Sequence, residues 1–241
     1  MKNFLVNIFN KITGKDIVSL SVSPEIIKKR QDSAVYHGLD KKSYDLIIKH
    51  ETGGKDYYNS KLSKPCYPGG ESGVTIGIGY DLGYNTQASF AKDWKSKLDA
   101  KHFARLNALL GLKGKEAKEK ISSVKDITIS WEIALEVFNE KTLPRFIALT
   151  KRSFPGSGEL HPAAFGALVS LVFNRGGSTK GASRKEMKNI RDALEGKITV
   201  DNIYKYIADQ IVAMKRLWVG KGLDGLLRRR NEEADIIRKC K

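Results

Sequence analysis

Residues 74–83, with the sequence Val-Thr-Ile-Gly-Ile-Gly-Tyr-Asp-Leu-Gly, constrain the fold of this 241-residue chain more than any other segment. Apolar and small residues alternate along the first half, in the order Val74, Thr75, Ile76, Gly77, Ile78 and Gly79. This alternation is typical of a strand that packs on one face and carries small residues on the other. Turn-forming residues precede it in Gly-Gly-Glu-Ser-Gly, so the segment predicts a β-hairpin. The glycines leave room for a large ligand, such as a sugar chain, to lie against the backbone.

A helix with a carboxylate on its apolar side precedes this strand. Tyr44, Ile47 and Ile48 fall on one helical stripe, and Glu51 continues that stripe at position i+7. Thr-Gly-Gly follows directly, which predicts that the helix ends there and places Glu51 at the mouth of a cavity. Burial of a carboxyl group raises its pKa, as a proton donor at neutral pH requires. The alternative is that Glu51 only caps the last turn or faces solvent.

Most of the remaining chain has the spacing or composition of helices. The predicted helices are 86–98, 102–110, 115–122, 130–149, 162–174, 184–194, 200–217 and 223–238. Strand character is confined to the region of Thr75. The sequence therefore predicts an α+β protein that is mainly helical, with a small hairpin lobe, a larger helical lobe and a cleft between them.

Glu51 and the segment Thr75-Ile-Gly-Ile-Gly-Tyr80 resemble the catalytic glutamate and the Thr-Ile-Gly-x-Gly strand of the phage-type lysozymes. In the common pattern of that family an aspartate or cysteine lies between the glutamate and the threonine. Here Thr75 follows Glu51 by 24 residues (75 − 51), and Gly69 stands where the intervening acid is expected. A subgroup that includes the lysozyme domain of the bacteriocin pesticin has a longer insertion and carries its aspartate after the threonine. Asp81, six residues beyond Thr75 (81 − 75), is similar to that aspartate.

The resemblance implies a role for each of these residues. Cleavage of a glycosidic bond needs a carboxylic acid that protonates the leaving oxygen and a second group that directs water or stabilises the oxocarbenium-like transition state. Glu51 would be the acid, Asp81 the ionised partner, and Thr75 would orient the attacking water. Glu71 and Asp56 are alternatives for the second carboxylate, although both lie in loops where a solvated charge is the default.

Segments nearer the C-terminus resemble the same family. Leu-Val-Phe-Asn-Arg-Gly at 171–176 is similar to the central helix whose end lines the cleft, which implies substrate contacts for Phe173 and Asn174, together with Tyr80 of the strand. Ordinary helix-end packing is the alternative for the first two. Residues 129–138 resemble the middle helix of the family, and 218–234 resemble its closing helix. The resemblance implies a lysozyme-like catalytic domain over residues 38–241.

Residues 1–37 form a separate N-terminal segment or linker by this reasoning. Apolar residues fall on one helical face at Phe4, Leu5, Ile8, Phe9 and Ile12. A helix docked on the domain, an amphipathic anchor and a translocation handle all fit the pattern. The segment lacks a small-residue cleavage site and is a poor secretory signal. We therefore expect a protein made in the cytoplasm that acts in the periplasm or cell wall after export or delivery.

The chain has 43 Lys and Arg against 27 Asp and Glu, a net charge of +16. This excess favours polyanionic partners: nucleic acid, anionic lipid or the acidic components of a bacterial wall. No zinc-finger, RNP-type or basic-zipper motif accompanies it, so we do not expect nucleic acid to be the partner. No apolar run is long enough for stable membrane insertion. A helix would spread Arg228, Arg229 and Arg230 around its axis, so we expect one to point inward, where it could pair with Glu51, and the others to be solvated.

Cysteine and histidine are scarce. Cys66 and Cys240 are too few for a disulfide framework, and the sequence leaves their pairing open. A cysteine replaces the second acid in some phage lysozymes, but Cys66 lies nine residues before Thr75 and does not match, so an ordinary loop thiol is the preferred interpretation. The four histidines form no ligand cluster. We expect no metal and no cofactor.

The resemblance thus implies a muramidase, a glycoside hydrolase that cleaves the β-1,4 bond between N-acetylmuramic acid and N-acetylglucosamine and lyses bacterial walls, as an endolysin or toxin effector. Peptidoglycan is the expected partner of a monomeric protein, with delivery machinery or an immunity protein if the chain is a delivered toxin. A lytic transglycosylase, which cuts the same bond with one acid and no water, remains an alternative. A wall-binding module without activity is another, because a fold does not guarantee catalysis.

Overall fold

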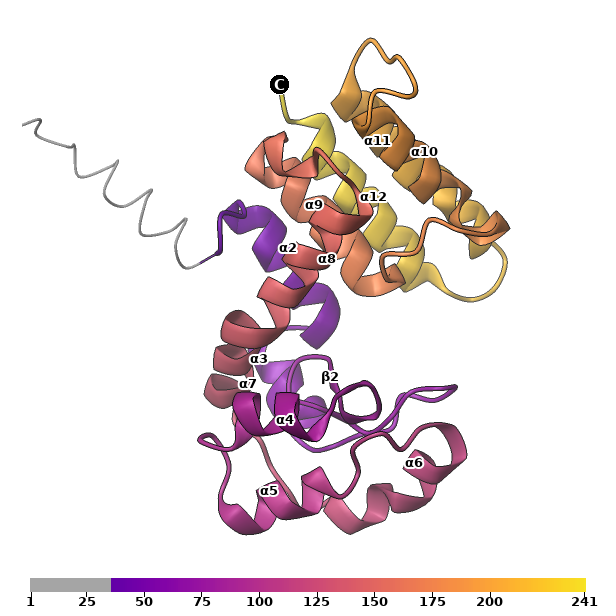
Figure 1. The fold of residues 1–241 in the computed structure, drawn as a ribbon. Coiled ribbons are helices and arrows are strands. Elements are labelled where there is room, and N and C mark those ends of the chain that lie inside the picture. The colour runs from indigo at the N-terminus through magenta and orange to yellow at the C-terminus, as the bar shows by residue number, and fades with distance from the viewer. Residues whose placement is uncertain (1–35) are drawn as a thin grey trace, which may run out of the picture.

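The structure is a computed structural model and describes residues 36–241 (Figure 1). Its α-helices are α2 (Lys41–Thr52), α3 (Lys55–Tyr57), α4 (Gln87–Trp94), α5 (Ala100–Asn107), α6 (Gly114–Lys120), α7 (Trp131–Val137), α8 (Leu143–Ser153), α9 (Pro162–Arg175), α10 (Lys185–Leu194), α11 (Ile203–Ala213) and α12 (Asp224–Arg238). Two short strands, β1 (Thr75–Ile76) and β2 (Tyr80–Asp81), form an antiparallel pair. Mostly helical with one small sheet, the described chain confirms the predicted α+β class.

Local sequence signals explain where the helices begin. The side chains of Asp40, Thr86, Asp99 and Ser130 each accept a hydrogen bond from a backbone N–H in the first turn of the helix that follows. Such caps satisfy N–H groups that have no partner within the helix. All the predicted helices are present, with ends that differ by a few residues.

The hairpin differs from the prediction in its register. Thr75 pairs with Asp81 and Ile76 with Tyr80, so the turn consists of residues 77–79 and lies inside the segment predicted to be a continuous strand. Gly77 and Gly79 have φ angles of +55° and +68°, a region that disfavours side chains. A Cβ on Gly77 would also lie 3.0 Å from the ring of Trp94. These glycines therefore serve the turn, and the expectation that they clear space for a ligand was wrong for Gly77.

The buried apolar side chains form two clusters. One cluster joins α2 and the hairpin to α4 through α7, and its largest fully buried side chain is Trp94. The other lies among α9, α10, α11 and α12. Figure 1 shows two groups of elements, with the hairpin and α4 to α7 below and α9 to α12 above, and with α2 beside α9. Helix α9 is buried along nearly its whole length because α2, α8 and α12 all pack against it.

The connection between the two groups is a long helix with an irregular centre. The segment predicted as a single helix over 130–149 consists of α7, a π-helical turn at Phe138–Thr142, and α8. Helix α7 lies with the lower group in Figure 1, and α8 rises from it to the upper group. A π-helical turn changes the direction of side chains along a helix and is frequent at functional sites.

Two further predictions concern the N-terminal segment and membrane insertion. The apolar helical face predicted at the N-terminus lies outside the described residues. Within residues 36–241, no helix combines the length and apolar character needed to cross a membrane.

Candidate functional site

Glu51 lies in the last turn of α2, as the sequence predicts. The helix ends at Gly53, whose φ of +68° and N–H bond to the carbonyl of Lys49 form a left-handed C-cap. Tyr44 and Ile47 are buried on the inner face of the helix, whereas the side chain of Glu51 keeps 19% of its surface exposed. Glu51 is therefore anchored by a buried helix face and reaches the surface at its end.

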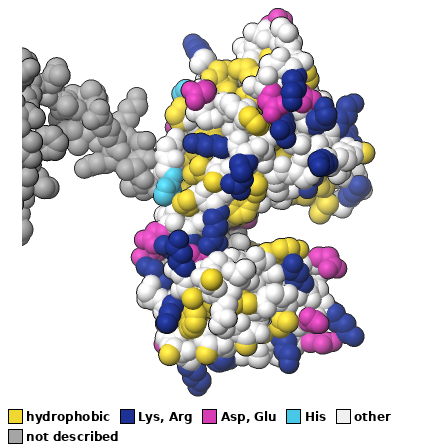
Figure 2. All heavy atoms as spheres, viewed as in Figure 1, with side chains coloured by type: hydrophobic (Ala, Val, Ile, Leu, Met, Phe, Trp, Pro, Cys, Tyr) yellow, Lys and Arg dark blue, Asp and Glu magenta, His cyan; other side chains and the backbone are white. Residues whose placement is uncertain are grey.

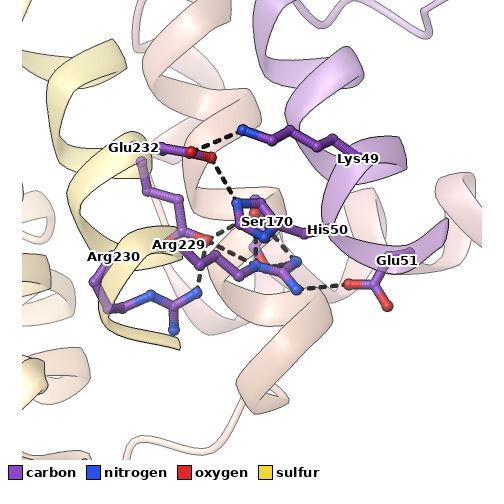
Figure 3. Close-up of polar contacts among 8 residues, drawn as sticks. Lys49, His50, Glu51, Ser170, Arg229, Arg230 and Glu232 are labelled. Carbon is purple, nitrogen blue, oxygen red and sulfur yellow. Dashed lines mark hydrogen bonds and ion pairs between the residues drawn. The ribbon is translucent and has the colours of Figure 1, made fainter. Parts of the chain in front are cut away.

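The carboxylate of Glu51 is ion-paired rather than isolated. Arg229 of α12 donates from Nη1 to Glu51 Oε1 at 2.7 Å, and its own side chain is only 4% exposed (Figure 3). Arg229 also donates through Nη2 to the carbonyl of Ser170 at 3.0 Å and through Nε to Glu233 at 3.3 Å. These bonds fix the direction of the guanidinium group, which in turn fixes the carboxylate of Glu51.

Arg230 and Glu233 complete the buried network. Arg230 is fully buried and donates to Glu233 Oε1 at 2.7 Å and to Asn174 Oδ1 at 3.2 Å. Ser170 donates its hydroxyl hydrogen to the same oxygen of Glu233 at 2.7 Å. Two guanidinium groups, Arg229 and Arg230, thus face two carboxylates, Glu51 and Glu233. Buried charges are retained when they are paired in this way.

The consecutive arginines of α12 were only partly predicted. The inward direction of Arg229 and its pairing with Glu51 are confirmed, and Arg228 is exposed as expected. The expectation that Arg230 would be solvated was wrong, because Glu233 and Asn174 supply partners inside the protein. Nothing in the local sequence identifies those partners.

A second polar group flanks Glu51 on the same helix. His50 lies 2.7 Å from Glu232 through Nε2, and Lys49 donates to the other oxygen of Glu232 at 2.8 Å (Figure 3). Burial lowers the pKa of His50, while the hydrogen bond to Glu232 opposes that effect and the charge of Arg229 adds to it. The uncharged imidazole is therefore favoured beside Glu51.

Glu51 lines two neighbouring cavities, which also share His50 and Gly225. The first, of about 620 Å³, lies against α12 and includes Tyr57, Arg228 and Glu232. The second, of about 410 Å³, includes Asn174 and the segment from Gly222 to Leu226. The carboxylate is thus accessible to a ligand from both cavities.

The hairpin brings three of the discussed side chains side by side. Thr75 lies directly opposite Asp81 in the β1–β2 pair, and its backbone also exchanges hydrogen bonds with Cys66, at 2.8 and 3.0 Å. Directly opposed residues of antiparallel strands project from the same face. Burial, followed by the charge of Asp81, raises the pKa of the Cys66 thiol. The proximity of Cys66 to Asp81 was missed, since its spacing from Thr75 gave no sign of it.

Backbone groups hold the carboxylate of Asp81. It accepts hydrogen bonds from the N–H of Gly83 at 2.8 Å and from the N–H of Gly73 at 3.0 and 3.1 Å. A Cβ on Gly73 would lie 2.5 Å from Asp81 Oδ1, so only glycine permits this approach. These bonds fix the direction of the Asp81 carboxylate within the hairpin.

Asp81 and Glu51 line different cavities. Asp81 lies in a hollow of about 520 Å³ that also includes Tyr84, Arg145, Phe146 and Arg152. The end of α9 lies between this hollow and the cavities of Glu51: a Cβ on Gly79 of the hairpin would lie 3.3 Å from the ring of Phe173, while the next residue, Asn174, lines the cavity of Glu51. Two neighbouring residues at the end of α9 thus relate to the two carboxylates: Phe173 lies against the hairpin that carries Asp81, and Asn174 lines a cavity of Glu51.

The structure places Tyr80 and Phe173 mainly in packing roles. The Tyr80 side chain is buried, donates to Asp93 at 2.9 Å and has its pKa raised to about 12, chiefly by burial. Arg145 pairs with the same carboxylate of Asp93. Phe173 contacts the ring of Phe146 with centroids 4.1 Å apart. Tyr80 borders the hollow of Asp81, but its hydroxyl serves the core.

The remaining candidates lie elsewhere. Glu71 and Asp56, the alternative second carboxylates, are exposed and line none of these cavities. Cys66 and Cys240 are free thiols. Among residues 36–241, no group of three or more His, Cys, Asp or Glu side chains has the arrangement of a metal site.

Residues 44–145 match the model of a family described as a domain of unknown function, DUF8812. The matched region runs from α2 into α8 and contains Glu51, Thr75 and Asp81, but neither Asn174 nor Arg229. No curated protein matches the chain.

Proposed function

We propose that the protein is a peptidoglycan hydrolase with a lysozyme-like fold, and that it cleaves the β-1,4 bond between N-acetylmuramic acid and N-acetylglucosamine. The observation that carries the proposal is Glu51: a carboxylate at a helix end, open to two cavities and held in one direction by Arg229. The glycan would lie in a cleft between the two groups of elements. In the face drawn in Figure 2 the surface is hollowed between them, which supports this path.

Glu51 would act as the general acid. Protonation of the leaving oxygen contributes about 10²- to 10⁴-fold to the rate of such reactions. As general acid, Glu51 must carry a proton when the glycosidic oxygen is in place, whereas in the free protein its carboxylate is paired with Arg229. A sugar chain that fills the cavities would remove water from Glu51 and favour the neutral form. Arg229, which hydrogen bonds to Ser170 and Glu233 hold in place, would then stabilise the carboxylate of Glu51 once its proton has left.

Asp81 and Thr75 would supply the second group. Asp81 is held in place by two backbone N–H groups, and its carboxylate would stabilise an oxocarbenium-like transition state. Thr75 lies opposite it, and no protein partner for its hydroxyl occurs within the described chain, so the hydroxyl is available to a water molecule. Asn174, which lines a cavity of Glu51 at the end of α9, would contact the sugar.

A lytic transglycosylase is the second candidate, and one observation favours it. Glu51 and Asp81 line different cavities, and a reaction that needs only one carboxylate would use Glu51 alone. In that reaction a hydroxyl of the substrate replaces water as the nucleophile. The product then carries an anhydro end in place of a reducing end.

The test is the substitution Glu51→Gln, which keeps the shape of the side chain and removes its acidic proton. We expect turnover of purified peptidoglycan to fall by at least about 10²-fold with the fold retained by circular dichroism. Asp56→Asn is the matched control, because it removes one exposed carboxylate from the next helix. If Glu51→Gln digests the wall at the wild-type rate, the proposal is wrong.

A further inference from the structure

A cluster of four arginines, Arg175, Arg184, Arg216 and Arg230, lies where the end of α9 meets the loop to α10. Two of its members face one aromatic ring: the guanidinium carbons of Arg175 and Arg230 lie 4.8 and 5.8 Å from the centre of the Trp218 ring. Arg175 donates to the carbonyl of Ser183 at 2.6 Å. Arg216, the third member, donates to the neighbouring carbonyl of Ala182 at 2.9 Å, so both side chains hold the same loop.

Two of the four positive charges are already balanced. Arg216 is ion-paired with Glu186 at 2.5 Å. Arg230 is ion-paired with Glu233 at 2.7 Å, in the network where Glu51 balances Arg229. The carboxylates of Glu186, Glu233 and Glu51 are thus each already paired with an arginine.

Neither Arg175 nor Arg184 forms an ion pair with a carboxylate within residues 36–241, and the charge of Glu186, which also acts on Arg175, is already paired with Arg216. Arg175 and Arg184 are both half-buried, and the contact found for Arg184 is with the sulfur of Met187 at 3.5 Å. The Nε atoms of Arg175 and Arg230 are buried without any hydrogen-bond partner. Burial and then the charges of Arg184 and Arg230 lower the pKa of Arg175 to about 10. Partly buried positive charges without a counter-charge are costly, so the cluster is incomplete as it stands.

We propose that this cluster is a binding site for a phosphate group, held by Arg175 and Arg184 beside Trp218. The two unbalanced guanidinium groups carry a charge of +2, and a phosphate monoester or free phosphate ion carries about −1.5 to −2 at pH 7. A carboxylate would leave one guanidinium unbalanced. The planar fork of arginine also matches two phosphate oxygens at once.

The site is separate from the proposed catalytic centre. Arg230 joins the two regions, since it donates to Asn174 of the Glu51 cavity and contacts Trp218 of the cluster. The phosphate could be a free ion or the terminal phosphate of a larger molecule. The site would form in either case, whatever bond the protein cleaves.

Calorimetric titration of the full chain tests the proposal, with inorganic phosphate and glycerol 3-phosphate as the two probes and sodium chloride at matched ionic strength as the reference. We expect saturable binding of at least one probe at one site per chain. Binding of inorganic phosphate alone would identify a free ion as the ligand, and tighter binding of glycerol 3-phosphate would identify a carried phosphate.

Arg175→Gln and Arg184→Gln should each weaken binding about tenfold or more, the usual effect of losing a hydrogen bond to a charged group. Arg191→Gln is the control, because it removes an equal charge from α10 at a residue paired with Glu195. Without phosphate, Arg184→Gln should melt at or above the wild-type temperature, since it removes an unbalanced charge. Absence of saturable binding, or equal weakening in Arg191→Gln, would overturn the proposal, as would a lower melting temperature of Arg184→Gln that phosphate does not affect.

Discussion

Glu51 and Asp81 are positioned by opposite means. Glu51 depends on a side chain 178 residues away, Arg229, which is itself held by Ser170 and Glu233. Asp81 depends on the backbone N–H groups of Gly73 and Gly83, within eight residues of its own position. The position of Glu51, the proposed acid, therefore depends on how α2, α9 and α12 pack, whereas Asp81, the proposed second carboxylate, is positioned within one hairpin. Substitutions in the network of Glu51 should therefore be visible in the free energy of unfolding, whereas substitution of Asp81 should be visible mainly in turnover.

The largest effect beyond Glu51 itself is expected for the hairpin carboxylate. Asp81→Asn removes a charge that would stabilise the transition state, so turnover of peptidoglycan should fall by about 10²- to 10³-fold. Asparagine retains one oxygen for the N–H groups of Gly73 and Gly83, so the variant should still fold, with a lower melting temperature. Glu71→Gln and Asp56→Asn should remain near wild type. If Glu71→Gln is the inactive variant, the assignment of the second carboxylate is wrong.

Arg229, the ion-pair partner of Glu51, should contribute mainly to the free energy of unfolding. Arg229→Gln leaves Glu51 and Glu233 with one positive partner between them, and loss of one member of a buried ion pair costs about 3–5 kcal/mol. Arg228→Gln is the matched neighbour on the same helix and is exposed, so its effect should stay within about 0.5 kcal/mol. Denaturant unfolding measures both. Equal stabilities of the two variants would mean that the Arg229 network does not hold the helices together.

Substitution of Asn174, at the end of α9, should have a smaller effect on turnover. Asn174→Ala removes a side chain that lines the cavity of Glu51, and turnover should fall about tenfold if a sugar hydrogen bond is lost. The same change leaves Arg230 Nη1 without its acceptor, at a cost of about 1 kcal/mol in the free energy of unfolding. Normal turnover per folded molecule with a larger loss of stability would indicate a purely structural role.

The smallest effect concerns the surface charge. Lys and Arg side chains are numerous on the upper helical group in the face drawn in Figure 2, and the chain carries a net charge of +16. If this charge concentrates the protein on an anionic wall, activity on whole sacculi should fall as the Debye length shrinks from about 10 Å to about 3 Å. Activity on short soluble glycan fragments should fall much less. An equal response of both substrates would contradict a role for the charge in wall attraction.

The sequence predicted the helices well because their signals are local. Caps such as Asp40 and Ser130 lie beside the helices that they start, and the apolar stripe of α2 predicted the buried face that carries Glu51. The register of the hairpin was not predictable in the same way. Alternating glycines are compatible with one face of a strand and with a turn that needs positive φ, and only packing of Gly77 against Trp94 decides between them.

The geometry of the candidate site could be predicted only in part. The resemblance to phage-type lysozymes implied roles for Thr75 and Asp81, which stay predictions, and the structure pairs these two residues in the hairpin. The burial of Arg230 and the position of Cys66 beside Thr75 depend on contacts between segments far apart in the chain. Periodicity and spacing carry no information on such contacts.

The most direct test of the central claim, that Glu51 and Asp81 act together with water on one glycosidic bond, is mass analysis of the products from purified peptidoglycan digested in ¹⁸O-labelled water. The account predicts muropeptides with labelled reducing ends on N-acetylmuramic acid from the wild type, and none above background from Glu51→Gln or Asp81→Asn. Unlabelled anhydro ends, formed equally well by Asp81→Asn, would contradict the account and favour a reaction that uses Glu51 alone. No cleavage by the folded wild-type protein would contradict both reactions.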